Sequence, residues 1–345
     1  MVKMIDVAKA AGVSTKTVSR VLNNEPHVRD NIRQNVLKAV QELGYVPSAS
    51  ARHLRSNRSY ALHIISHTLN SNFVNAIQSG ALLTSQEHGY KLVLSLLDMS
   101  TSDTPEKLEQ WCKDLISKNK PDGVILIPPY NNSALINNIL TNAKVPIIRI
   151  GPNSIIDNSK TILIDDFAAA KDIVNHLIDL GHKRIAFVRG LEDQDATHKR
   201  FEGYRRALKD SNIEFDETLV FSGDFDFVSG MAAGDKVFEL TNMPSAVFAA
   251  NDDMAAGVLV SALKRNIKIP AQLSIAGFDD SELAEKMWPQ ITTVRQPIFE
   301  FGKRAAEILI SCSNNSIKQT SENNAFERLN YKLVLRNSTS ENLSC

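Results

Sequence analysis

Two basic side chains near the N-terminus have the type and spacing needed to contact the edges of DNA bases. Lys16 and Arg20 stand four residues apart, so a helix places them on one face. Both can donate hydrogen bonds to O6 and N7 of guanine, and Arg can donate two at once. The alternative is an ordinary charged helix face in solvent, which these two residues alone do not exclude.

Three short helices are predicted around this face. Residues 4–11 have apolar side chains mostly on one helical side, and a turn over residues 12–14 interrupts them. A second helix over residues 15–22 begins after Ser14, a good N-cap, and a third begins near Arg29 and ends before Gly44. A glycine-containing turn between the first two helices is typical of a helix-turn-helix, whose second helix enters the major groove.

Charge is distributed unevenly along a chain of 345 residues whose formal net charge is zero. Residues 1–60 hold ten Lys and Arg against four Asp and Glu, whereas the remaining residues hold 29 against 35. A small basic head therefore precedes a larger acidic body, and the head is the part suited to a polyanion.

Residues 48–55 provide about two helical turns with almost no apolar surface, and an isolated helix of that length is marginal in water. The segment carries Arg52, Arg55 and one conspicuous apolar side chain, Leu54. It is either a flexible basic linker or a segment that folds on DNA and inserts Leu54 between base steps of the minor groove.

The run from Ile5 to Asn23, followed by residues 43–47 (LGYVP) and 51–54 (ARHL), resembles the lactose/galactose repressor family of bacterial transcription regulators. The resemblance implies a homodimeric repressor on double-stranded DNA with a pseudo-palindromic operator. It assigns base contacts to Thr15, Lys16 and Arg20, and minor-groove contacts to Ala51 and Leu54. Phosphate contacts are expected from Ser14, Thr17, Tyr45, Arg52 and Arg55. Arg29 departs from the family, which commonly has a capping Ser there, and this weakens the cap by about 1 kcal/mol.

From Tyr60 onward, short apolar runs alternate with helical patterns, which is the signature of parallel sheets covered by helices. Nine such units exceed what one sheet usually holds, so the fold class is α/β with two doubly wound subdomains after the helical head. The expected strands are residues 61–66, 91–97, 123–128, 145–150, 161–165, 184–189, 219–222, 246–250 and 274–278.

The expected domains are a head over residues 1–47, a hinge over 48–59 and an effector-binding and dimerisation domain over 60–345. Within the last, the first subdomain is assigned residues 60–162 plus 295–323. The second is assigned residues 163–294 plus 324–340.

Ligands of open α/β sheets bind beyond the carboxyl ends of the strands, where this chain has polar and aromatic side chains. Asn251, Asp252 and Asp279 also have an ordinary alternative role as helix N-caps, and Arg200 has one as a surface charge. The family resemblance continues here through residues 187–190, 200–204, 248–255, 277–280 and 292–297, and implies a two-lobed domain like the periplasmic sugar-binding proteins. The effector-binding residues expected are Asn72, Phe73, Asp165, Arg200, Phe225, Asn251 and Asp279.

A carboxylate accepts hydrogen bonds from sugar hydroxyls, a guanidinium and an amide donate to them, and an aromatic face covers the apolar side of the ring. The expected effector is therefore a sugar or sugar phosphate that controls operator affinity allosterically. The alternative is a purine or another non-sugar metabolite that acts as corepressor.

Several classes of protein are disfavoured. The chain lacks GxG, GxxxxGK, GxSxG and HExxH motifs, so no enzyme, cofactor or metal site is expected. Three widely spaced cysteines and no signal peptide or membrane-length apolar run fit a cytoplasmic protein rather than a secreted transport component. No leucine heptads follow the last predicted strand, over residues 331–336, so a dimer is expected rather than a coiled-coil tetramer.

Leu54→Ala should weaken operator binding and leave effector affinity nearly unchanged, because the side chain is expected to act only within the bent duplex. Titrations of the variant with operator DNA and, separately, with effector measure the two affinities. Loss of effector binding would contradict the assignment.

Overall fold

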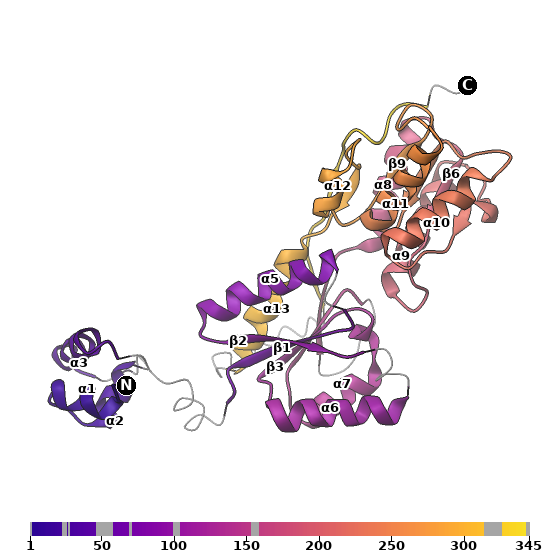
Figure 1. Cartoon of the computed structure of the whole chain (residues 1–345). Helices are drawn as coiled ribbons and strands as arrows, with labels where there is room; N and C mark the ends of the chain where they lie inside the picture. Colours follow the sequence, from indigo (N-terminus) through magenta and orange to yellow (C-terminus); the bar gives the residue numbers. More distant parts are fainter. Residues whose placement is uncertain are drawn as a thin grey trace. The chain divides into compact units, whose positions relative to one another are not determined.

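The computed structural model describes residues 2–22, 26, 28–45, 58–68, 71–98, 104–152, 159–313 and 326–342. The chain forms two compact units, Met1–Ser59 and Tyr60–Cys345 (Figure 1). Ala51, Arg52, Leu54 and Arg55 lie outside the described residues, so the proposed roles of the hinge residues stay predictions.

The first unit is built from α1 (Met4–Ala10), α2 (Thr15–Leu22) and α3 (Asp30–Glu42). Their apolar faces meet in a core that contains Val7, Val18 and Val36, each fully buried. The three predicted helices are therefore present, with the helix-turn-helix order intact.

The helix ends in this unit follow the side chains available to cap them. The Ser14 hydroxyl accepts a hydrogen bond from the Thr17 amide at 3.1 Å, as expected of an N-cap. At the start of α3, Arg29 occupies the N-cap position and makes no capping hydrogen bond through its side chain. The departure at Arg29 thus leaves the amino end of α3 without a side-chain cap.

The first lobe of the second unit is a six-stranded sheet in the order β11-β5-β4-β3-β1-β2, with all pairs parallel. Its strands are β1 (Ala61–Ser66), β2 (Lys91–Leu96), β3 (Gly123–Leu126), β4 (Ile147–Ile150), β5 (Ser159–Leu163) and β11 (Phe326–Arg328). The helices of this lobe are α5 (Asn72–Glu87), α6 (Pro105–Asn119), α7 (Ala134–Asn142) and α13 (Ile298–Ser313), with a short 3-10 turn over Tyr130–Asn132.

Alternating side chains of the strands bury the two faces of this sheet separately. Ile64 and Ile125 pack in the core beneath α5 and α13, whereas Ile65 and Val124 pack in the core beneath α6 and α7. Figure 1 shows these two helix pairs on opposite faces. Successive side chains of a strand face opposite sides of the sheet, and here both sides are buried. Continuous apolar runs therefore predicted strands that are covered on both sides.

The second lobe has a four-stranded parallel sheet in the order β7-β6-β8-β9. Its strands are β6 (Ile185–Val188), β7 (Val220–Phe221), β8 (Ala246–Ala249) and β9 (Ser274–Ala276). Its helices are α8 (Asp166–Asp179), α9 (Asp195–Asp210), α10 (Phe227–Phe238), α11 (Asp252–Lys264) and α12 (Glu282–Lys286), with a 3-10 turn over Glu217–Leu219. The nine predicted strands are present as β1–β9, and the prediction of two doubly wound sheets is confirmed.

One subdomain assignment differs from the structure. Residues from 324 onward were expected in the second lobe, but β11 pairs with β5 and extends the first sheet. The guanidinium of Arg304 on α13 holds Glu327 of this strand with two hydrogen bonds, at 2.6 and 3.1 Å. The chain then reaches the second lobe, where β12 (Lys332–Val334) pairs antiparallel with β10 (Thr293–Arg295).

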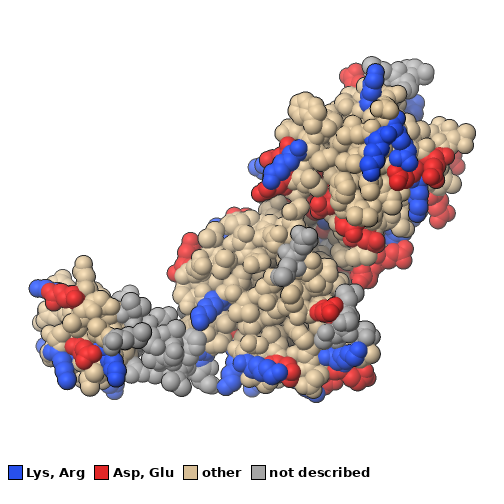
Figure 2. All heavy atoms as spheres, viewed as in Figure 1, with Lys and Arg blue, Asp and Glu red and all other residues tan. Residues whose placement is uncertain are grey.

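Charges of both signs are interspersed over the visible face of the molecule (Figure 2). In the described part of the chain, none of the helices combines the length and apolar character that crossing a membrane requires. Cys112 is buried and Cys312 is exposed, and both are free thiols.

Two glycines allow α5 and α13 to touch backbone to backbone. A Cβ atom on Gly302 would lie 1.9 Å from the carbonyl oxygen of Ile77, and one on Gly80 would lie 2.0 Å from that of Phe299. Neither carbonyl can move without shifting its helix. Glycine at these positions therefore sets the distance between the two helices that cover one face of the first sheet.

Gly302→Ala should lower the free energy of unfolding by about 1–3 kcal/mol, because the strain of separating the helices exceeds the gain in helix propensity. Urea denaturation measures the change. Gln86→Ala, at an exposed position of α5, is the matched control and should stay within about 0.5 kcal/mol of the parent chain. Equal urea midpoints for Gly302→Ala and the parent would contradict the packing argument.

Candidate functional site

A buried arginine occupies the carboxyl end of the second sheet. Arg200, 5% exposed, donates from Nε to Asp166 at 2.9 Å and from Nη1 to the carbonyl of Ala250 at 2.6 Å. Its guanidinium lies 3.7 Å from the centroid of the Phe278 ring, and Nη1 is 3.8 Å from Asp279. The surface-charge alternative for Arg200 is therefore wrong.

Asp279 lies just beyond β9, in the segment that leads to α12. Its φ of 115° is in the left-handed region, and its Oδ1 accepts a 2.6 Å hydrogen bond from the amide of Gln296. Burial raises the pKa of Asp279 to about 7, while Arg200 and the Gln296 amide act in the opposite direction. The carboxyl can therefore accept or donate a hydrogen bond near neutral pH.

The two consecutive aspartates at the end of β5 have different roles. Asp165, the predicted effector ligand, caps α8 by accepting from the Ala168 amide at 3.0 Å and pairs with Arg328 at 2.9 Å. Asp166 is the residue that faces Arg200, and burial raises its pKa. Asp165 thus acts as an N-cap, and its contact with an effector stays a prediction.

Asn251 and Phe225 lie side by side near the end of β8. The Asn251 side chain caps α11 by accepting from the Met254 amide at 3.0 Å and donates to the carbonyl of Phe225 at 2.8 Å. Phe225 has a φ of 61°, and its ring leaves no room for a side chain at Gly190. The capping role of Asn251 is thus observed, and its contact with an effector stays a prediction.

A small cavity of about 40 Å³ lies between the two lobes, which is little more than the volume of one water. Side chains from both lobes and from the crossing segments line it: Phe73, Pro128, Asn131, Gly151, Ile164, Asp166, Gln194, Asp195, Ala196, Arg200, Gln296 and Phe301. Phe73 and Arg200, predicted from sequence, are therefore together at one site. We call it the interlobe cleft.

A wider groove of about 580 Å³ adjoins the interlobe cleft. Phe73 and Gln296 line both hollows and form the wall between them, and Asn72 and Asp279 line the groove. Across this groove the Asn72 amide reaches Asp253 of α11 at 3.5 Å, and burial raises the pKa of Asp253. Asn72, the first residue of α5, is thus placed to contact the opposite lobe.

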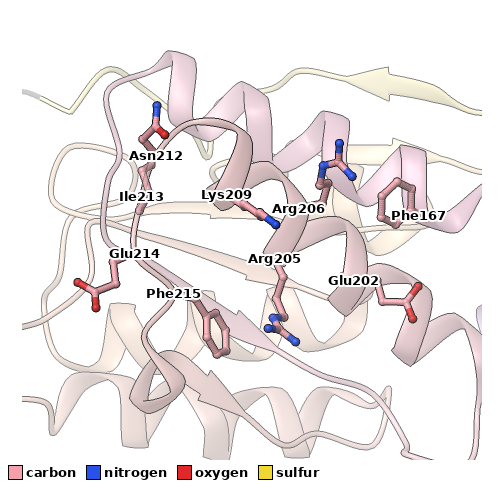
Figure 3. A pocket seen from close by; sticks show the side chains of 9 residues that line it. All are labelled: Phe167, Glu202, Arg205, Arg206, Lys209, Asn212, Ile213, Glu214 and Phe215. Atoms are coloured by element: carbon pink, nitrogen blue, oxygen red, sulfur yellow. The ribbon is translucent and has the colours of Figure 1, made fainter.

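A third hollow, of about 690 Å³, is formed by α9 and the loop that follows it, with Phe167 of α8. Figure 3 shows the charged side chains Arg205, Arg206 and Lys209 of α9 around it, with Phe215 at one side. Arg205 lies 4.9 Å from the Phe215 ring, and Arg206 pairs with Asp210 at 2.7 Å. None of the predicted effector residues lines it.

The predicted base-contacting side chains in the first unit are accessible. Thr15, Lys16 and Arg20 are exposed on α2, opposite the buried Val18. Tyr45 instead packs in the helical core and is 7% exposed. Of the expected phosphate ligands described, Ser14 and Thr17 are therefore better placed than Tyr45.

Sequence reasoning missed several polar residues of the interlobe cleft, among them Asp195, Gln194, Asn131 and Gln296. Asp195 and Gln194 lie at the start of α9, and Asn131 follows β3. Each lies just beyond a strand or at the first turn of a helix, so the rule used for the other strand ends could have found them. Gln296 lies in the stretch 292–297 that resembles the family, but the sequence did not assign it to the site.

Comparison with known proteins agrees with both units. The model of "Bacterial regulatory proteins, lacI family" matches residues 3–48, and that of "Periplasmic binding protein-like domain" matches residues 174–339. Catabolite control protein A of Priestia megaterium is 32% identical over 98% of this chain and 99% of its own length. The chain belongs to the LacI family of bacterial regulatory proteins. This LacI-family protein is a DNA-binding transcriptional repressor and not an enzyme.

Other relatives and solved structures match over similar lengths. The transcriptional repressor PurR of Vibrio atlanticus is 34% identical over 90% of this chain and 91% of its own. A complex of the regulator CelR with cellobiose has a TM-score of 0.72 at 30% identity, over 98% of this chain and all of the other. The lac repressor dimer bound to operator and the anti-inducer ONPF has a TM-score of 0.79 at 25% identity, over 98% and 99%.

Asp279→Asn should make the free energy of unfolding of this LacI-family protein less dependent on pH. The folded-state pKa of about 7 lies above the ordinary 3.8, so the stabilisation by the bound proton is complete below about pH 4 and is lost as pH rises through 7. For the parent chain this loss amounts to about 4 kcal/mol at most.

Urea denaturation of both proteins from about pH 4 to 8 measures the loss of stability with rising pH, which should be smaller in the variant because the contribution of Asp279 is removed. Asp193→Asn, the same chemical change at an exposed position, is the control and should retain the parental pH dependence. If the free energy of unfolding varied with pH in the same way for Asp279→Asn and the parent, Asp279 would be ionised in the folded protein throughout this pH range.

Proposed function

We propose that a small carbohydrate bound between the lobes controls the operator affinity of this repressor in the cytoplasm. The observation that carries the proposal is the cluster of Arg200 with Asp166 and Asp279, which lies beside the aromatic Phe73 at the interlobe cleft. Carboxylates, a guanidinium and an aromatic face together suit a ring with several hydroxyls.

The relation to CelR supports a sugar, because that regulator was solved with cellobiose and matches this chain over 98% of its length. A cleft built to bond hydroxyls rejects a ligand that lacks them, since buried polar groups would be left without partners. In the effector assignment, the residues that contact the sugar are Arg200, Asp279, Phe73 and Asn72. Phe225, which follows β7, and Asn251, which follows β8, support the site.

A purine or another non-sugar corepressor is the second candidate. Phe73 and Phe301 both line the interlobe cleft, and aromatic faces also suit a flat heterocycle. Binding of the full-length protein to operator DNA, with and without sugars and purines, separates the two. A sugar is expected to release the protein from DNA, whereas a corepressor would tighten binding.

The operator is proposed to be pseudo-palindromic and bound by a homodimer, as in the lac repressor dimer bound to operator. In the second lobe, Val228, Leu263 and Trp288 are 67%, 48% and 79% exposed. Val228 is on α10, Leu263 is on α11 and Trp288 follows α12. Exposed apolar side chains of this kind fit a surface that is buried between subunits. Two heads would then contact half-sites related by the two-fold axis.

Lys16→Ala should reduce discrimination between a selected operator and random duplex by roughly 1–3 kcal/mol. Binding sites are first selected with the parent chain from a pool of randomised duplexes, and competition titrations then measure the preference of each variant.

Lys38→Ala is the matched control, since Lys38 is also exposed in the first unit but pairs with Glu42 at 3.8 Å on α3. Lys38→Ala removes the same charge. It should weaken binding to the selected operator and to random duplex to a similar extent, because attraction to phosphates is independent of sequence. An undiminished preference in Lys16→Ala would remove this residue from the base-contacting set.

A further inference from the structure

The charged groups at the interlobe cleft are predominantly acidic. Among the described residues that line it, Asp166 and Asp195 face a single cation, Arg200. Asp279, within 3.8 Å of Arg200, and Asp253, which contributes to the raised pKa of Asp279, add two further carboxyls at its edge. The centre of the site therefore holds more carboxyl groups than basic side chains.

Arg200 is not placed to attract an additional anion. Its guanidinium already has Asp166 at 2.9 Å and Asp279 at 3.8 Å, and Nη1 donates to the Ala250 carbonyl. An incoming phosphate at this arginine would lie against two carboxyl groups at distances of a few ångströms. In a buried site such repulsion is screened far less than in water.

The positive end of the α9 helix dipole already has a carboxylate beside it. Helix N-termini attract anions through their free amides and the helix dipole. Here Asp195 is the first residue of α9 and lines the cleft, so a carboxylate already occupies the favourable place for a negative charge. A second anion there would have to displace or neutralise it.

The first lobe offers little positive charge to offset the carboxyl groups of the interlobe cleft. Arg149 is 1% exposed, donates to Ser159 and to the carbonyl of Asn131, and has Asp195 as the carboxylate that favours its charged form. His67 follows β1 beside Pro128, and burial lowers its pKa, so it is neutral at pH 7. The residues of this lobe that line the cleft are uncharged.

The surroundings of Asp166 already disfavour negative charge, even without a ligand. Burial raises the pKa of Asp166, and its neighbours Asp165 and Asp195 add to that effect while Arg200 opposes it. The site can therefore accept hydrogen bonds from hydroxyl or ammonium groups, and another negative charge would be unfavourable there.

We propose that the interlobe cleft selects an uncharged or cationic effector, such as a neutral sugar or an amino sugar, and excludes phosphorylated and other anionic ligands. This inference rests on the proposed function, since it specifies the chemical class of the ligand bound at the same site. It narrows the sequence-based expectation, which allowed a sugar phosphate.

The test uses the full-length protein and matched probes: glucose, glucosamine and glucose 6-phosphate; ribose and ribose 5-phosphate; cellobiose; adenosine and AMP. Thermal unfolding screens them, and isothermal titration at about 0.15 M salt measures the dissociation constants. A neutral or amino member should bind, and its phosphorylated counterpart should bind at least about 100-fold more weakly.

A substitution tests the cause of this selectivity. Asp195→Asn should reduce the discrimination against the phosphorylated counterpart at least about tenfold, because it removes the carboxylate from the amino end of α9. Asp193→Asn, an exposed aspartate two residues earlier, is the matched control and should retain the discrimination.

Each outcome decides a different claim. Binding of glucose 6-phosphate more tightly than glucose would overturn the charge selectivity and leave a carbohydrate effector standing. Binding of adenosine but no sugar would overturn the carbohydrate effector and leave the charge selectivity standing. A panel in which no neutral or amino probe binds, or unchanged discrimination in Asp195→Asn, would also overturn the proposed selectivity.

Discussion

The burial of one guanidinium constrains the centre of the second unit. Arg200 is held away from water, so the protein must provide it with acceptors, and it does so from three places in the chain: Asp166 on α8, the Ala250 carbonyl after β8 and Asp279 after β9. Removing one partner from a buried ion pair costs about 3–5 kcal/mol, far more than the pair itself contributes. The cluster therefore fixes the ends of two strands and one helix relative to each other, and a ligand meets an arrangement already formed.

Packing within each lobe is tight, whereas the contact between the two lobes across the groove is looser. Within lobes, glycines bring helices into backbone contact, as Gly302 does against Ile77 and Gly257 does against Phe227. Across the groove, the Asn72–Asp253 hydrogen bond is long, at 3.5 Å. Close-packed units resist deformation, whereas the segments that cross between them change conformation at lower cost. Ligand-dependent motion is therefore expected between lobes and not inside them.

Much of this architecture could be predicted from the sequence, because buried parallel strands give continuous apolar runs that alternate with helical patterns. The strand β11 could not, since Phe326 is its only large apolar side chain and its pairing is set by the distant β5. The site was predicted in part. Arg200 and Asp279 follow from the strand-end rule together with the family motifs, but the choice between Asp165 and Asp166 depends on which side chain caps α8. Which of the two aspartates caps the helix depends on the exact residue at which α8 begins. Neither composition nor spacing specifies that residue.

In the proposed control by a ligand, the first lobe is the part of the second unit nearest in sequence to the DNA-binding head, because the chain enters this unit at β1. The Tyr60 amide donates to Asp122 at 2.8 Å, and the Tyr60 ring lies 5.4 Å from that of Tyr90, so the start of β1 is anchored. On the effector side, Gln296 joins Asp279 to the segment that opens α13, and α13 packs on α5 and on strands of the first sheet. A ligand hydroxyl that replaced the Gln296 amide at Asp279 would act on this segment first. A change there of 1–3 kcal/mol, which is about one hydrogen bond to a charged group, equals the coupling free energy typical of allosteric proteins. Under the proposed control of operator affinity, the contacts at Asp279 are therefore large enough in magnitude to supply the coupling.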